Sequence, residues 1–456
     1  MQTRRFFIGG ALSAGIAGLP AFAQAGAAAK GGELLRLGVL SDIHLRRAGD
    51  EAPFRRALEY FRSRQVDGVI VAGDIANDGA VSQLVLAAET WYSVFPDDRM
   101  PDGRHVERLF ILGNHCVMNE IGRDRAAAWR KAFHEDYEPI WRKTVRGIPV
   151  IGAHWITGVN IDDNGIEAYM REHGRELDPH LPFIYIQHGH PKDTCFGPWA
   201  WGHDDGRATR ALSPFPNAIV FSGHSHYSLV DERTVWQGAF TSVNTGSMSY
   251  VSTDYALREN VTQNSHGYRG EKRPHRMPCL VTSDGKHGQV VTIGRDRMVL
   301  ERRDFNANES LGDDIEVPLP ARATSPIAYA VRASKRSAPA FAADAAVAVS
   351  TIPAKDEKDF VRIELKFPAA RAVDGCRVNE YEVTAVLVED DVELVQVQRR
   401  MLSPDHYRPV SGLVKDVSFV FAQEDFPLRG HYRFEVRPIE CFGKKGNKIV
   451  SSLTVI

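Results

Sequence analysis

Short apolar runs alternate with helix-like stretches over the first third of the chain. Three apolar runs have the length of buried strands: residues 34–40, 66–72 and 108–112. Between them, apolar residues recur with helical spacing behind Pro53 and over 81–95, and a third helical stretch surrounds 123–133. Alternating strands and helices predict an α/β domain built of packed layers.

The pattern is less regular over residues 143–180, where we expect an insertion. Two further apolar strands follow, PFIYIQHGH over 182–190 and NAIVFSGHSH over 217–226, and both end in histidines. From about residue 236 to 305 the sequence takes on the alternation and turn residues of β-strands. We therefore predict one domain over residues 34–308.

The remainder of the chain is β in character. We predict a linker over residues 309–325, which contain the run VPLPARATS, and a second, all-β sandwich domain over 326–456. The segment YRFEVRPIECFGKKG, residues 432–446, resembles the last hairpin of a fibronectin type III or related immunoglobulin-like sandwich.

Composition limits the classes of partner. The chain has 456 residues, 43% of them hydrophobic and 25% charged, and a formal net charge of -2. This balance argues against nucleic acid as a dedicated partner and against an anionic membrane. Five cysteines without paired spacing give no sign of a disulfide framework or a zinc knuckle. Only His406 and His431 follow residue 300, so imidazole chemistry belongs to the first two thirds of the chain.

The N-terminus is predicted to be a processing segment. Arg4 and Arg5 precede an Ala/Gly-rich apolar stretch and the cleavage-type sequence Ala21-Phe22-Ala23. This resembles a bacterial twin-arginine export signal over residues 1–23, followed by a lead segment over 24–33. The apolar stretch is shorter than about 20 residues and contains Gly and Pro, which argues against a stable membrane anchor. The resemblance implies a periplasmic or secreted mature chain.

Polar residues of metal-binding type follow five of the predicted strands. They are Asp42 and His44, Asp74, Asn114 and His115, His188 and His190, and His224 and His226. In an extended chain residues i and i+2 project to the same side, so each spaced pair is expected to face one point. Ligands beyond the carboxyl ends of strands meet at one edge of an α/β sheet. Mixed oxygen and nitrogen donors suit borderline divalent metals such as Mn, Fe, Co, Ni or Zn.

The ordered set SDIH, GDIANDG, GNH, a strand-end histidine and GHSH resembles the calcineurin-like metallophosphoesterase superfamily. The resemblance implies an αββα sandwich and two divalent metal ions. One ion would be held by Asp42, His44 and His226, and the second by Asn114, His188 and His224, with Asp74 bridging both. His188 is preferred over His190 because it comes directly off the strand. His190 would then support the ligands or face the substrate.

The same resemblance implies hydrolysis of a small-molecule phosphate mono- or diester, by in-line attack of a hydroxide held between the metals. His115 would protonate the leaving group. Asn77 stands where purple acid phosphatases carry a tyrosine, which argues against that type. Cys116 stands where many relatives carry an acidic residue that orients the histidine. Another group or a backbone carbonyl is left to orient His115 here.

An aromatic loop follows the strand that carries His188. Trp199, Trp201 and Arg207 either belong to a packed aromatic loop or form a rim that stacks on the leaving group, with Arg207 near the phosphate. Two other functions compete with the phosphoesterase. His115 beside Cys116 suggests a cysteine hydrolase, although neighbouring strand residues point to opposite faces. A binding or adhesion protein would use the C-terminal sandwich and carry a vestigial metal site.

Overall fold

The computed structural model describes residues 32–156, 164–198, 200–252, 282–354, 361–373, 377–390, 392–422, 425–426 and 428–456. The predicted signal segment 1–23, almost all of the lead segment 24–33, and Trp199 lie outside the described residues. Among the described helices, none has both the length and the apolar character that a membrane crossing requires.

Seven strands form the first sheet of the N-terminal domain, in the order β12-β11-β10-β1-β2-β3 with β13 beside β11. The strands β1, β2 and β3 run parallel and are almost entirely buried, which explains their continuous apolar runs. The strands are β1 (Leu35–Leu40), β2 (Gly68–Ala72), β3 (Glu107–Ile111), β10 (His287–Ile293), β11 (Arg297–Asp304), β12 (Glu309–Ser310) and β13 (Ile315–Pro318).

A second sheet has the order β4-β5-β6-β7-β9-β8, and β5, β6, β7 and β9 run parallel. Its strands are β4 (Ile140–Val145), β5 (Ile148–Ala153), β6 (Phe183–Ile186), β7 (Ala218–Ser222), β8 (Val235–Gln237) and β9 (Thr241–Asn244). The prediction of an insertion over 143–180 is wrong, because β5 pairs with β6 inside this sheet. The apolar run of β5 is short and directly follows the Arg146-Gly147 turn, so its sequence pattern did not indicate a strand clearly.

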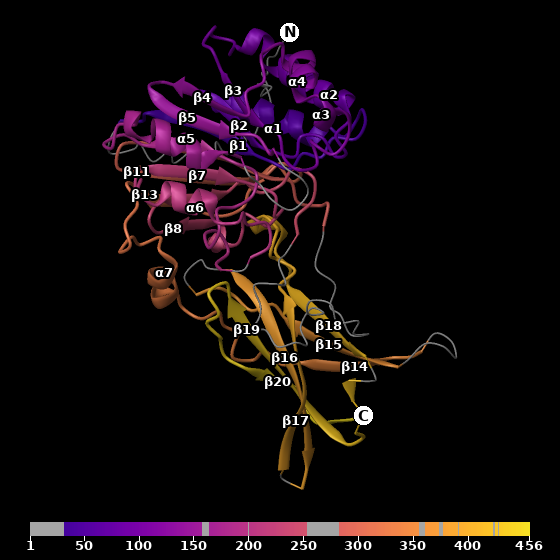
Figure 1. Cartoon of the computed structure of the whole chain (residues 1–456). Coiled ribbons are helices and arrows are strands. Elements are labelled where there is room, and N and C mark those ends of the chain that lie inside the picture. Colours follow the sequence, from indigo (N-terminus) through magenta and orange to yellow (C-terminus); the bar gives the residue numbers. More distant parts are fainter. Residues whose placement is uncertain are drawn as a thin grey trace, which may run out of the picture.

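The two sheets pack face to face, with Leu37 and Ile70 of the first against Ile184 and Phe221 of the second in one core. Helices cover both outer faces, which gives the four layers αββα and confirms the predicted fold (Figure 1). The helices are α1 (Ala52–Ser63), α2 (Val81–Val94), α3 (Glu120–Arg123) and α4 (Arg125–Phe133) on the first sheet, and α5 (Ile166–His173) and α6 (Arg207–Leu212) on the second. Short 3-10 turns are η1 (Pro96–Asp98), η2 (Gly174–Glu176) and η3 (Glu232–Thr234).

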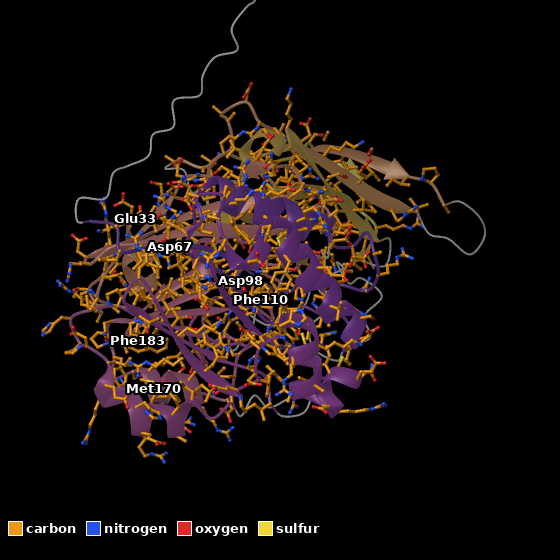
Figure 2. All side chains as sticks on the ribbon, turned by 90° about the horizontal axis from the view of Figure 1, so that it is seen from above. Glu33, Asp67, Asp98, Phe110, Met170 and Phe183 are labelled. Atoms are coloured by element: carbon orange, nitrogen blue, oxygen red, sulfur yellow. The ribbon has the colours of Figure 1, made fainter. Side chains whose placement is uncertain are left out.

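Side chains from the outer layers fill two separate cores. Phe110 belongs to the core beneath α1, α2 and α4, whereas Met170 and Phe183 belong to the core beneath α5 and α6 (Figure 2). The helix α1 buries the face that its spacing predicted, and Gly38 of β1 leaves the space that the Phe61 ring occupies. Burial of a side chain of this size stabilises the fold by about 1.5–3 kcal/mol.

The C-terminal domain consists of two antiparallel sheets, β14-β15-β18 and β17-β16-β19-β20, with β21 beside β19. Leu365 and Phe419 of the smaller sheet share one core with Val383 and Phe434 of the larger sheet. The predicted all-β domain is therefore confirmed, and its fibronectin or immunoglobulin type stays a prediction. Its elements are β14 (Ala348–Ile352), β15 (Arg362–Pro368), β16 (Val378–Glu389), β17 (Val392–Leu402), η5 (Val410–Gly412), β18 (Asp416–Ala422), β19 (His431–Glu440), β20 (Ile449–Val450) and β21 (Thr454–Val455).

The connection between the domains is more ordered than a linker. Strands β12 and β13 lie inside the predicted linker 309–325, yet both pair with β11. In β13 the exposed Glu316 separates the more buried Ile315 and Val317, an alternation that the neighbouring prolines obscured. Next follows α7 (Tyr329–Lys335), whose Arg332 donates to the backbone carbonyl of Val235. The N-terminal domain thus extends through the residues predicted to separate it from the sandwich.

Candidate metal centre

All seven predicted metal ligands lie at the carboxyl ends of parallel strands. They come from five strands: Asp42 and His44 after β1, Asp74 after β2, Asn114 after β3, His188 after β6, and His224 and His226 after β7. Because β1–β3 belong to one sheet and β6–β7 to the other, the site spans the edge where the two packed sheets meet.

The backbone at these ligands is left-handed rather than extended. Five ligands have positive φ: Asp42 (52°), His44 (51°), Asp74 (49°), His224 (70°) and His226 (57°). The predicted reason for the i, i+2 spacing, an extended chain with both side chains on one side, is therefore wrong. Left-handed residues at alternate positions turn the chain after β1 and β7, and Asp and His tolerate this conformation better than most residues.

One donor group gathers around Asp42. Its Oδ1 lies 3.2 Å from Nε2 of His226, and the Nε2 atoms of His226 and His44 are 3.1 Å apart. Nε2 of His44 is also 3.6 Å from Oδ2 of Asp74. One ligand atom from each of these four residues lies within 4.8 Å of the others, a spacing that a single metal ion fits.

A second donor group shares Asp74 with the first. Oδ2 of Asp74 lies 3.2 Å from Nε2 of His188, which is 3.1 Å from the side-chain oxygen of Asn114. Asp74, His188 and His224 again offer ligand atoms within 4.8 Å of one another. Asp74 therefore lies between the two groups, where a bridging ligand is predicted.

Charge is distributed so that the carboxylates stay ionised. Burial alone would raise the pKa of Asp42 and of Asp74, but the facing imidazoles of His226 and His188 hold each pKa well below its usual range. Burial lowers the pKa of His44 to about 4 and that of His224 to about 3, so both rings are neutral at pH 7. Burial opposes protonation of His188 too, but the Asp74 carboxylate outweighs it and raises the pKa to about 9.

Each carboxylate has one oxygen anchored and the other directed into the cluster. Oδ2 of Asp42 accepts hydrogen bonds from the Ser41 hydroxyl and from the His224 backbone N–H (3.0 Å), while its buried Oδ1 faces Nε2 of His226. Oδ1 of Asp74 accepts from the His115 backbone N–H at 2.9 Å, which leaves Oδ2 facing the imidazoles. A buried, ionised carboxylate oxygen is costly unless a cation is bound beside it. The residues present therefore fit borderline divalent metals.

The family model for Calcineurin-like phosphoesterase matches residues 35–228, which include all seven of these ligands. This part of the chain is a calcineurin-like phosphoesterase domain. No curated protein matches the chain.

Three solved structures are similar to part of this chain. A dimetal phosphatase from Danio rerio is 10% identical, covering 62% of this chain and 98% of that one, with a TM-score of 0.37. GAP50, the anchor in the inner membrane complex of Plasmodium, is 12% identical over 63% of this chain and 89% of its own, with a TM-score of 0.39. A predicted phosphoesterase from Streptococcus pneumoniae TIGR4 is 13% identical over 62% and 97%, with a TM-score of 0.27.

Three glycines of the phosphoesterase domain make room for the ligands. A Cβ added to Gly113 would overlap the Asp74 carboxylate and lie 2.8 Å from Nε2 of His188. A Cβ on Gly73 would overlap the ring of His188. A Cβ on Gly223 would overlap the Ser41 hydroxyl next to Asp42. The glycines of the GD, GNH and GH sequences are thus required by the close approach of neighbouring strand ends.

Backbone carbonyls fix the orientation of two ligand rings. Nδ1 of His188 donates to the carbonyl of Ala72 at 2.7 Å. Nδ1 of His226 donates to the carbonyl of Tyr250 at 3.1 Å and lies 3.0 Å from the Ser247 hydroxyl. These bonds place a proton on Nδ1 and leave Nε2 as the ring atom that faces the cluster, where it would bind a metal.

His115 lies beside the cluster and is also oriented by a backbone carbonyl. Its Nδ1 donates to the carbonyl of Asn77 at 2.7 Å, and its ring meets the His44 ring edge-on at 4.7 Å. Cys116 lies on the other side, fully buried in the core beneath the helices, where its sulfur accepts from the Ala76 N–H. Burial raises the pKa of the Cys116 thiol to about 12, so it has neither the access nor the charge of a nucleophile.

Three aromatic rings surround the ligand histidines. Trp201, with 53% of its surface exposed, stacks on His224 at 4.6 Å, and Tyr250 stacks on His226 at 4.0 Å. The buried Trp155 lies 5.6 Å from the His224 ring. Sequence reasoning selected Trp201 but missed Trp155 and gave Tyr250 no role. Trp155 follows β5 at the same kind of strand end as the ligands, and that position was the available signal.

The other predicted residues have different surroundings. His190 is buried, and its ring nitrogens bond the hydroxyls of Ser222 (2.7 Å) and Ser225 (2.8 Å), which favours the predicted supporting role over contact with a substrate. Arg207 begins α6 and pairs with Asp205 at 3.4 Å. The role of Arg207 near the phosphate stays a prediction.

Proposed function

We propose that this chain is an exported, dimetal phosphohydrolase that cleaves phosphate mono- or diesters. The observation that carries the proposal is the position of Asp74, whose carboxylate is shared by two compact groups of buried donors. Asp42, His44, Asp74 and His226 would hold one ion, and Asp74, Asn114, His188 and His224 the other. Mn, Fe, Zn, Co and Ni all suit these donors.

A phosphate ester resists hydrolysis because its anionic oxygens repel nucleophiles and its alkoxide leaves poorly. Two divalent ions supply neutralisation of the phosphoryl oxygens and a water that is nucleophilic at neutral pH. The chain holds the donors in fixed positions, since the oriented rings of His188 and His226 and the anchored carboxylates need no rearrangement. Such preorganisation is the main protein contribution to phosphoryl transfer.

His115 is proposed as the general acid. With Nδ1 committed to the Asn77 carbonyl, Nε2 is the ring nitrogen left to carry a proton to the leaving oxygen. Proton transfer of this kind contributes about 10²- to 10⁴-fold to a rate. The substrate is proposed to be a small-molecule ester whose leaving group contacts the exposed face of Trp201. The twin-arginine sequence Arg4-Arg5 supports export to the periplasm or medium.

The test is an assay of the mature chain, stripped of metal and refilled with individual ions. Activity on a mono-aryl phosphate is compared with activity on a bis-aryl phosphate, which assigns the ester class. Asp74→Asn removes the shared charge and should bind fewer than two ions and lose about 10²-fold or more in kcat/KM. Asp136→Asn, at a side chain that is 82% exposed, is the matched control and should behave as wild type. Full activity of Asp74→Asn, or of the wild type in chelator, would refute the proposal.

A further inference from the structure

A buried histidine joins the C-terminal domain to the phosphoesterase domain. His287 is the first residue of β10 and is fully buried. Its Nε2–H donates to the backbone carbonyl of Tyr407, in the loop between β17 and β18, at 3.0 Å. Its Nδ1 accepts from the backbone N–H of Leu229, three residues after the ligand His226, at 3.3 Å. Both ring nitrogens are therefore used, one toward each domain.

These two bonds require one neutral tautomer of His287. Donation from Nε2 and acceptance at Nδ1 are possible together only when the ring is uncharged. Burial lowers the pKa of His287 to about 3, which agrees with that geometry. The ring is thus a fixed spacer between the Tyr407 loop and the backbone that follows His226.

A second path runs from the same residue to the metal ligand. The backbone N–H of His287 donates to the carbonyl of Ser247 at 2.7 Å, and the Ser247 hydroxyl is 3.0 Å from Nδ1 of His226. The neighbouring Lys286 donates to the carbonyl of Ser249. His287 therefore contacts two backbone segments near His226. One contains Leu229, shortly after His226 in the sequence, and the other contains Ser247, whose hydroxyl lies beside the His226 ring.

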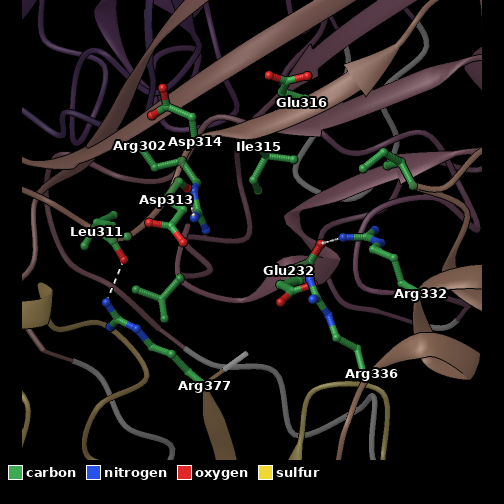
Figure 3. Close-up of a pocket in the computed structure, with 13 residues that line it drawn as sticks. Glu232, Arg302, Leu311, Asp313, Asp314, Ile315, Glu316, Arg332, Arg336 and Arg377 are labelled. Atoms are coloured by element: carbon green, nitrogen blue, oxygen red, sulfur yellow. Dashed lines mark hydrogen bonds and ion pairs between the residues drawn. The ribbon is translucent and has the colours of Figure 1, made fainter. Parts of the chain in front are cut away.

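The Tyr407 loop is itself held in place by an arginine at the domain interface. Arg377, immediately before β16, donates to the carbonyl of Arg408 and, at 2.6 Å, to the carbonyl of Leu311 beside β12 (Figure 3). Leu311 belongs to the phosphoesterase side, where its N–H donates to the carbonyl of Arg302. Arg377 thus binds backbone carbonyls of both domains and sets the position from which Tyr407 reaches His287.

We infer that the C-terminal domain acts as a positioning element for one of the two metal sites, through the contacts of His287 with Tyr407, Leu229 and Ser247. The inference rests on the proposed dimetal function. The effect is expected at the ion held with His226, because the contacts of His287 with Leu229 and Ser247 lead to that ligand.

The test is titration of the metal-free, full-length protein with Co²⁺ by calorimetry, with bound metal counted after dialysis. His287→Leu should raise the Kd of one Co²⁺ at least about threefold, below the roughly 10- to 100-fold cost of removing a direct partner of a ligand. The second Kd should stay within about twofold. His287→Gln, whose amide can still donate to the Tyr407 carbonyl, should recover most of the affinity.

Arg377→Met changes no residue of the phosphoesterase domain and should weaken the same single site. Arg433→Met is the matched control, because Arg433 lies on β19 and pairs with Glu393 and Glu435 of the sandwich. If His287→Leu does not fold, Arg377→Met carries the test. Unchanged Kd values in both variants, or equal weakening of both sites, would overturn the inference and leave the proposed function intact. A wild-type protein that binds fewer than two ions would overturn the proposed function and the inference with it.

Discussion

Nδ1 of His115 lies 2.7 Å from the main-chain carbonyl oxygen of Asn77. Position 116 holds a cysteine and not the acidic residue that the resemblance led us to expect after the histidine. The bond to the Asn77 carbonyl orients His115 instead. A carbonyl fixes the tautomer as a carboxylate would. His115 is therefore oriented by the fold of the β2 turn and not by a neighbouring side chain.

The first prediction follows because the acceptor for His115 is a main-chain atom of Asn77. Asn77→Ala removes the amide side chain and leaves the carbonyl in place, so kcat should stay within about twofold of wild type, as for a substitution outside the site. The measurement is steady-state kinetics on the ester class that the metal-refill assay selects. A drop of tenfold or more would mean that the Asn77 side chain takes part.

Replacement of His115 tests the general acid. His115→Ala should lower kcat by about 10²- to 10⁴-fold on an alkyl phosphate, whose alkoxide needs a proton. It should lower kcat far less on a 4-nitrophenyl ester, whose leaving group departs unprotonated. Bound metal, counted on the same samples, should be unchanged. Equal losses on both esters would remove His115 from the proton-transfer step.

Cys116 gives a third prediction. Burial raises the pKa of this thiol to about 12 and that of Cys195 to about 11, so both stay protonated in the folded protein at pH 8. Iodoacetamide reacts with thiolate, and should modify both residues only after unfolding, where a cysteine pKa is about 8.5. Peptide mass spectrometry reads out each site. Cys116→Ser should keep its activity, whereas an inactive but metal-loaded variant would restore the cysteine-hydrolase hypothesis.

A methyl group at Gly113 should disrupt the centre. In Gly113→Ala the new Cβ would overlap the Asp74 carboxylate and crowd Nε2 of His188, so metal binding should weaken at least about tenfold. Gly32→Ala is the control, because no atom lies within 4 Å of its added Cβ. Metal titration and thermal unfolding in chelator separate lost binding from lost folding. Tight binding by Gly113→Ala would show that Asp74 can move without cost.

The aromatic rim gives the last prediction. Trp201→Ala removes the half-exposed ring on His224 and should raise KM about five- to tenfold for a substrate with a large leaving group. KM for a small aryl phosphate should change little. Trp236→Ala provides a comparison, since Trp236 packs against Phe240 in the outer core. The same rise for both substrates would argue that Trp201 only supports His224.

The cluster of buried donor residues could be predicted because their residue types and order carry the chemistry. Strand ends bring Asp42, Asp74 and Asn114 together in any parallel sheet of this topology. The local geometry could not be predicted, because positive φ at His44 and His226 replaces the extended chain that their spacing suggested. The layers followed from periodicity, except at β5, where the apolar run was too short to stand out.

Contacts made by main-chain atoms could not be predicted from residue types. The carbonyl of Asn77 that holds His115 and the carbonyl of Tyr407 that holds His287 exist at every position of a chain. Their use depends on which segments the fold brings together, and in the second case these segments lie in different domains. For the same reason the sequence predicted a linker where β13 completes a sheet with β11.

The left-handed backbone at five of the ligands has a consequence for which metals the protein carries. Each such residue costs about 1 kcal/mol relative to an ordinary conformation, and packing of the two sheets supplies that energy during folding. The donor atoms are then assembled before any ion arrives, and binding needs little further ordering of the chain. Ions can accordingly be exchanged without refolding. The identity of the metals at the proposed sites is therefore expected to follow the supply in the compartment where the folded protein resides.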